Sequence, residues 1–127
     1  MRRRRGQAIV EFAVILPVFL LLILGVIDFG MVAHQSQSLG HAAREGARLA
    51  ATGATESEIA SRLYSELSLR WSADEISFDI AETDKGGYRE ITVSLTAPFT
   101  FVTPVGQFVS GLSSQWVGMA SASFRKE

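Results

Sequence analysis

The chain has 127 residues and a formal net charge of −1, which leaves room for one small globular domain beside an apolar N-terminal segment. Four of its 12 basic residues, Arg2 to Arg5, precede that segment, so the rest of the chain carries 12 − 4 = 8 basic residues against 13 acidic ones. This acidic balance argues against binding nucleic acid, and the lack of cysteine excludes a disulfide framework.

The first predicted element is a membrane-spanning helix. Residues 12–27 contain no charged or polar side chain, and in residues 8–33 only Glu11 and Asp28 are ionisable. About 20 apolar residues cross the hydrocarbon core of a bilayer, so we predict a transmembrane helix over residues 7–33. The positive-inside rule then places the arginines in the cytoplasm and everything after residue 33 outside. The alternative, a cleaved secretory signal, has a shorter apolar region and would need a small residue in place of Met31.

Residues 34–53 are predicted to extend this helix as a stem outside the membrane. Small residues recur at a spacing of four along two rows, which allows another helix to approach closely; the rows are Ala42-Gly46-Ala50 and Ala43-Ala47-Ala51. Arg44 and Arg48 are four residues apart, and Glu45 can reach Arg48 at a spacing of three. Gly53 fits the left-handed position that ends many helices.

A second, amphipathic helix is predicted to follow. Thr55 and Glu58 have the spacing of a capping box, and Ile59, Leu63 and Leu67 form its apolar row. We expect this helix to end near Arg70 or Trp71, with its apolar row covering another element.

The last part of the chain has the pattern of a small antiparallel sheet. Apolar residues alternate over residues 76–80 and 91–97, around a glycine-containing turn at 83–87, which predicts a β-hairpin. Pro98 and Pro104 interrupt the next stretch, which is expected to cover the core with Phe99, Phe101, Phe108, Val109 and Leu112. Residues 116–124 are predicted to form a third strand. The fold class is therefore α+β: a long N-terminal transmembrane helix extended outside the membrane, then a small module of one amphipathic helix and a short antiparallel sheet.

No constellation of residues points to catalysis. Asp28-Phe29-Gly30 spells the DFG of kinases but lies at the end of a membrane span, without the glycine-rich or catalytic loops. His34, His41 and Glu45 share a helix face, but further ligands at a matching spacing are missing. We therefore expect no enzymatic activity, no cofactor, no metal and no small-molecule substrate.

The residues around Glu11 resemble a known processing site. Gly6-Gln7-Ala8-Ile9-Val10-Glu11-Phe12, after a basic leader and before a long apolar helix, is similar to the prepilin-processing site of type IV pilins. GQAIVEFAVILPVFLLLILGVIDFG at 6–30 and AAREGARLAA at 42–51 resemble, more specifically, the TadE/TadG-like minor pilins (pseudopilins) of the tight-adherence (Flp) pilus system. This resemblance implies that a prepilin peptidase cuts after Gly6, so that Gln7 becomes the new N-terminus.

The resemblance also implies roles for single residues. Glu11, followed by Phe12, would pair with the N-terminal ammonium of a neighbouring subunit, which offsets its desolvation cost and sets the axial register. The alternative is a hydrated, inert carboxylate at the headgroup level. Pro17 is either a flexible point of the stem or a tolerated membrane proline. Asp28 is either an intersubunit contact or, as we expect, a marker of the outer interface.

The remaining expectations concern contacts, domains and location. Arg44, Glu45 and Arg48 would contact the protein's own module or a partner helix, unless they form a solvated face. The predicted domains are a basic leader (1–6), a transmembrane helix (7–33), a helical stem (34–53) and an extracytoplasmic α+β module (54–127). The implied location is the bacterial inner membrane, in a single pass, and entry into the fibre is left open.

The function implied is that of a minor pilin that a prepilin peptidase processes and that takes part in Flp-type pilus assembly. Flp-type major pilins are very short, whereas this chain carries a sizeable exterior. Its partners would be the membrane, the peptidase, other pilin or pseudopilin subunits and pilus assembly proteins. The alternative is an unprocessed bitopic membrane protein whose extracytoplasmic module binds a ligand or a protein.

Overall fold

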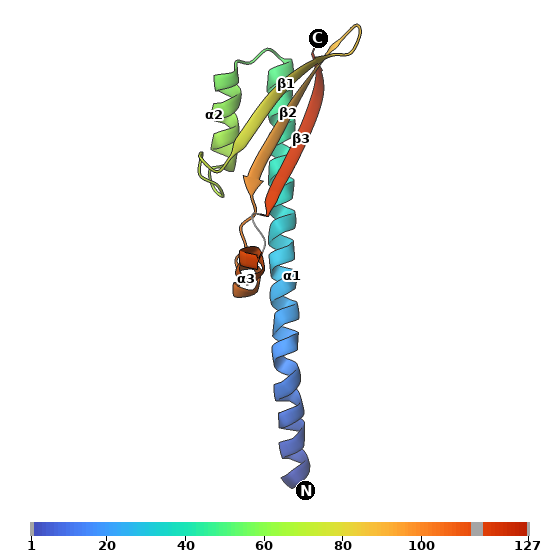
Figure 1. Ribbon diagram of the computed structural model, residues 1–127, viewed down its shortest axis with the longest axis vertical. Coiled ribbons are helices and arrows are strands. Elements are labelled where there is room, and N and C mark those ends of the chain that lie inside the picture. Colours follow the sequence, from blue (N-terminus) through green and yellow to red (C-terminus); the bar gives the residue numbers. More distant parts are fainter. Residues whose placement is uncertain (1, 113–115, 127) are drawn as a thin grey trace. The chain divides into compact units, whose positions relative to one another are not determined.

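The computed structural model describes residues 2–112 and 116–126 and confirms the α+β fold class. The elements in chain order are α1 (Arg2–Ala51), α2 (Glu56–Leu67), β1 (Ser77–Asp84), β2 (Arg89–Pro98), α3 (Pro104–Leu112) and β3 (Val117–Lys126) (Figure 1). They form two compact units. The first unit contains α1 as far as Val32 together with the segment from Thr100 that includes α3, and the second contains the rest of α1, α2 and the sheet.

In the first unit, α1 has the length and apolar composition needed to cross a membrane from Gly6 onward. Its apolar side chains over residues 12–27 are exposed or half-buried in the chain itself, as expected for a surface that faces lipid. Pro17 lies inside the helix, which continues on both sides of it.

The end of α1 and the start of α2 follow the predicted caps. Gly53 has a φ of 87°, and its N–H donates to Ala50 O at 3.1 Å while Ala54 N–H donates to Leu49 O at 3.1 Å. These two bonds form a Schellman motif, which satisfies the last carbonyls of the helix. In α2, Thr55 Oγ1 accepts from Glu58 N–H and a carboxylate oxygen of Glu58 accepts from Thr55 N–H, which is a complete capping box.

The second helix is shorter than predicted. It ends at Leu67 and not near Arg70 or Trp71. The chain turns at this point, with Arg70 N–H and Trp71 N–H both donating to Leu67 O. Trp71 is buried, and its indole N–H donates to Pro98 O at 2.7 Å. The turn places the indole ring of Trp71 against the end of β2. The helical periodicity of α2 does not indicate this position.

The second unit closes around one apolar core. The sheet is antiparallel in the order β1-β2-β3, with Phe78 opposite Leu95 and Val93 opposite Ala122 (Figure 1). The predicted hairpin face is confirmed, since all of its β2 members are buried: Ile91, Val93, Leu95 and Ala97. All members of the small-residue rows of α1 except Ala51 are buried at this core, and a Cβ built on Gly46 would lie 3.2 Å from Leu63 and 3.3 Å from Val93. These rows therefore accept α2 and β2 of the same chain.

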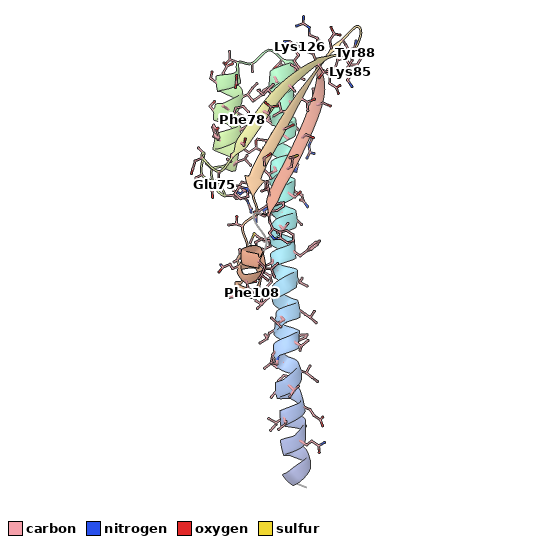
Figure 2. All side chains as sticks on the ribbon, in the orientation of Figure 1. Glu75, Phe78, Lys85, Tyr88, Phe108 and Lys126 are labelled. Atoms are coloured by element: carbon pink, nitrogen blue, oxygen red, sulfur yellow. The ribbon has the colours of Figure 1, made fainter. Side chains whose placement is uncertain are left out.

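The stretch after β2 was predicted wrongly, because it contains a helix. Thr103 is its N-cap, with Oγ1 accepting from Gly106 N–H at 3.3 Å, and Pro104 occupies the first helical position, where a missing N–H costs nothing. Phe108 and Leu112 are 70% and 72% exposed, so they do not cover the core as expected. Figure 2 labels Phe108 on α3. Phe99, in contrast, lies against Gly118 of β3.

Candidate functional site

The predicted processing site lies within the first turns of α1. Gly6, Gln7, Glu11 and Phe12 are all exposed and helical. Gln7 Nε2 donates to Glu11 Oε1 at 3.1 Å, because residues four apart meet on one helix face. The structure thus brings Gln7 and Glu11 together, the two residues for which the resemblance implies linked roles.

Gly6 has no packing role within the described part of the chain. A Cβ built on Gly6 meets no described atom within 4 Å, and the same holds for Gly25 and Gly30 in this helix. Glycine at position 6 is therefore not required for the fold, and it weakens the local helix by about 1 kcal/mol relative to alanine. A requirement for glycine here would have to come from a protein that binds this segment.

The Asp28 side chain accepts several hydrogen bonds within the first unit. It is 5% exposed, and its Oδ1 accepts from Val102 N–H at 3.2 Å and from Thr103 N–H at 3.1 Å. Its Oδ2 accepts a hydrogen bond from the hydroxyl of Thr103. The carboxylate thus accepts hydrogen bonds from the two backbone N–H groups just before α3. The positive end of the helix dipole is at this N-terminus and also favours a negative charge there.

Gly106 allows α3 to approach Asp28 closely. A Cβ built on Gly106 would overlap the Asp28 carboxylate and lie 2.7 Å from Cδ1 of Phe101. Asp28 had been expected to mark the outer interface or to contact another subunit, and the structure gives it a partner within the chain. That partner lies 74 to 75 residues away, a separation at which no sequence spacing signals a contact.

Arg44, Glu45 and Arg48 lie together on the second unit. Arg48 donates to Glu45 through Nε at 3.0 Å and through Nη2 at 2.7 Å, which is the ion pair that their spacing predicts. The hydrogen bond to Arg48 lowers the pKa of Glu45, helped by the positive charges of Arg48 and Arg62, and the pKa of Arg48 is raised in turn. Nη2 of Arg44 lies 3.4 Å from Nδ1 of His41. Whether these side chains also contact a partner helix stays a prediction.

These side chains border a groove that carries both signs of charge. Its lining comes from α1, α2 and β3: His41, Arg44, Glu45, Arg48, Arg62, Glu66 and Phe124. Among the described residues, no three of the types His, Cys, Asp and Glu gather closely enough to hold a metal ion.

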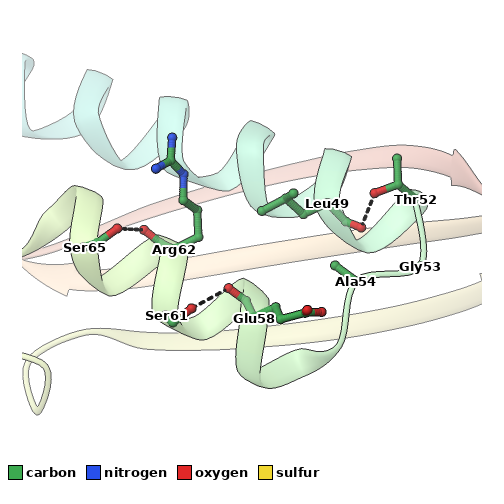
Figure 3. A pocket seen from close by; sticks show the side chains of 8 residues that line it. All are labelled: Leu49, Thr52, Gly53, Ala54, Glu58, Ser61, Arg62 and Ser65. Atoms are coloured by element: carbon green, nitrogen blue, oxygen red, sulfur yellow. Dashed lines mark hydrogen bonds between the residues drawn. The ribbon is translucent and has the colours of Figure 1, made fainter.

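A second hollow lies between the end of α1 and α2, as Figure 3 shows. Its hydroxyl groups are bonded to carbonyls of their own helix turns: Thr52 to Leu49, Ser61 to Glu58 and Ser65 to Arg62, at 2.8 to 2.9 Å. The Glu58 carboxylate is held by the capping box. These hydrogen bonds satisfy the side-chain hydroxyls and the helix ends. Their arrangement therefore serves stability and not acid–base chemistry.

Comparison with known proteins finds a similarity in the N-terminal part of the chain. The family model described as TadE-like protein matches residues 6–48, which confirms the resemblance predicted from the sequence. No curated protein and no solved structure matches the chain. The matched segment contains Gly6, Glu11, Asp28 and Glu45 and ends at Arg48.

Proposed function

We propose, from the match of residues 6–48 to the TadE-like family, that the chain is a processed minor pilin of the tight-adherence pilus. A prepilin peptidase of the bacterial inner membrane removes the leader 1–6, and the remaining chain assembles with other pilin or pseudopilin subunits. Its domains are the span 7–33, the stem 34–53 and the extracytoplasmic module 54–127, with the N-terminus cytoplasmic.

The observation that carries the proposal is the pairing of Gln7 with Glu11 on an exposed helix face. Cleavage after Gly6 removes the four arginines and converts Gln7 into a free N-terminus. A neighbouring subunit could then offer its new ammonium to Glu11 on the same face that Gln7 now occupies. In an apolar bundle this pairing offsets the cost of burying the carboxylate, and it fixes the axial offset of the subunits.

The proposal assigns no enzymatic role, in line with a TadE-like family that is not known for catalysis. The groove of Arg44, Glu45 and Arg48 is proposed as a contact for other pilus components, because it lies within or beside the matched segment and exposes both charge signs. Phe12 and Pro17 are proposed to take part in recognition and packing of the span.

The direct test is the N-terminus of the membrane-extracted protein, measured by intact mass and fragmentation. Cells with and without the prepilin peptidase of the system are compared. The proposal expects a chain that starts at Gln7 only when the peptidase is present. A chain that keeps residues 2–5 in both strains contradicts it and leaves the alternative, an unprocessed bitopic membrane protein.

A matched pair of variants separates recognition from folding. Gly6→Val should block cleavage, whereas Gly30→Val, in the same helix and equally free of contacts, should leave cleavage intact. Because neither position packs against the described chain, a loss of cleavage in Gly6→Val alone would report the peptidase site. Equal cleavage of both variants would contradict a role for Gly6.

The role of Glu11 is tested separately from cleavage. Glu11→Gln keeps an oxygen that can accept from Gln7 but removes the charge, and Glu11→Ala removes both. We expect both variants to be cleaved and both to yield fewer pili in the sheared surface fraction. Normal assembly of either variant would contradict the ammonium–carboxylate pairing.

A further inference from the structure

Exposed apolar side chains occur on α3 and on the residue before its cap. Phe108 and Leu112 are 70% and 72% exposed and lie four residues apart, which places them on one face of the helix. Val102, just before the N-cap, is also exposed. Two large apolar side chains on one exposed helix face, with a third exposed just before the N-cap, form a surface of the kind that marks contact with a protein or a membrane.

The hydrogen bonds of Asp28 fix the level of α3 along the span. Asp28 lies 17 residues after Glu11, which corresponds to about 26 Å along an α-helix. The hydrocarbon core of a bilayer is about 30 Å thick. With Glu11 at one boundary, Asp28 and the start of α3 therefore lie at the other boundary, where lipid headgroups and acyl chains meet.

The backbone before α3 is satisfied at this level. Irregular backbone is tolerated near the hydrocarbon only where its polar groups have partners. The N–H groups of Val102 and Thr103 and the hydroxyl of Thr103 all donate to the Asp28 carboxylate. The same bonds compensate a carboxylate that would otherwise be costly at the membrane boundary.

The composition around α3 selects lipid over a protein partner. Residues 91–124 contain no charged side chain, and the only polar side chains in α3 are Gln107 and Ser110. Protein interfaces usually have a polar rim, with aromatic and arginine residues near the centre. The apolar face of α3 instead belongs to the same unit as the exposed apolar surface that α1 presents over residues 12–27.

We propose that α3 is a membrane-interfacial helix, with Val102, Phe108 and Leu112 inserted among the acyl chains of the leaflet nearest Asp28. The inference rests on the membrane span of the proposed function and does not depend on cleavage or pilus assembly. Asp28 is thus the anchor that holds a second apolar element at the boundary.

The test uses the absence of cysteine from the chain. Single variants Val102→Cys, Phe108→Cys and Leu112→Cys of the full-length protein are labelled with an environment-sensitive fluorophore. They are reconstituted at low density into vesicles of phosphatidylethanolamine and phosphatidylglycerol. Leu22→Cys serves as the label inside the span, and Leu69→Cys, at a leucine that is 94% exposed in the second unit, serves as the label in water.

Quenching by nitroxide-bearing lipids and by aqueous iodide distinguishes the outcomes. We expect the three test labels to be quenched by the lipid nitroxide as the Leu22 label is, and several-fold less by iodide than the Leu69 label. Iodide quenching equal to that of the Leu69 label, with the Leu22 label protected, overturns the inference and leaves the span intact. Protection from both quenchers indicates contact with protein and also overturns it. An iodide-accessible Leu22 label would overturn the span and the inference together.

Discussion

The first compact unit keeps its apolar side chains on its surface, whereas the second buries them in a core of its own. Among the described residues of the first unit, those that are buried are Asp28, Thr103 and Gly106, a polar cluster held by hydrogen bonds. The second unit buries Leu39, Leu63, Val93 and Leu95 almost completely. The second unit is therefore stabilised by its own core, whereas the stability of the first unit depends on its surroundings.

The largest expected effect comes from the core of the second unit. Leu63→Ala removes a fully buried side chain and should lower the free energy of unfolding by about 2–5 kcal/mol. Urea unfolding of the full chain in detergent micelles, followed by tryptophan fluorescence, measures this change. Leu22→Ala in the first unit should change the same transition by less than about 0.5 kcal/mol. Equal effects of the two variants would contradict this difference between the two units.

The second prediction concerns the buried contacts that the structure describes in the first unit, around Asp28. Asp28→Ala leaves the N–H groups of Val102 and Thr103 without their acceptor, so α3 should detach locally while the second unit stays folded. Hydrogen–deuterium exchange over residues 101–112 should become more than about tenfold faster, with no change in β2. Asp28→Asn keeps an acceptor oxygen and should show a smaller effect. Unchanged exchange in Asp28→Ala would mean that α3 is held by other contacts.

A smaller effect is expected at the N-terminus of α2. Thr55→Ala removes the capping oxygen that accepts from Glu58 N–H and should cost about 0.5–2 kcal/mol of stability of the second unit. Ser65→Ala, an exposed change in the same helix, is the control and should be close to neutral, because alanine is the better helix former. The urea transition of both variants measures the difference, and a neutral Thr55→Ala would show that the cap is dispensable.

The smallest effect is a pH dependence from the same cap. The backbone N–H of Thr55, and then its hydroxyl, hold the pKa of Glu58 below its ordinary value of 4.5. A depressed pKa in the folded state means that the unfolded chain takes up the proton first. The contribution of Glu58 is therefore fully present above about pH 4.5 and is lost as the pH falls further. Urea midpoints between pH 7 and pH 3 should fall less for Glu58→Gln than for the unchanged chain, and parallel curves would contradict this role.

The elements that local periodicity and capping describe could be predicted from the sequence. The Schellman end at Gly53, the capping box at Thr55 and Glu58, and the buried face of β2 each depend on residues within a few positions of one another. Helix α3 escapes this kind of prediction, because Pro104 alone indicates a break and the nearby phenylalanines indicate a core. A threonine directly before a proline was the available signal, since it combines an N-cap with the preferred first helical residue.

The bonding of Asp28 could not be predicted from any spacing. Its partners are backbone N–H groups, which every residue except proline has, and they lie more than 70 residues away. A carboxylate in a membrane span indicates that a partner exists, but only the fold identifies it.

Helix α1 also constrains the biogenesis of the protein. Its C-terminal portion supplies five core residues to the second unit: Leu39, Ala42, Ala43, Ala47 and Ala50. A fragment that begins after Gly53 lacks these residues, so α2 and the sheet would have no third wall against which to fold. In the proposed topology, the insertion machinery must therefore leave this portion of α1 on the same side of the bilayer as the sheet. If α1 were shifted by a few turns into the lipid, the chain would still cross the membrane, but the second unit could not fold.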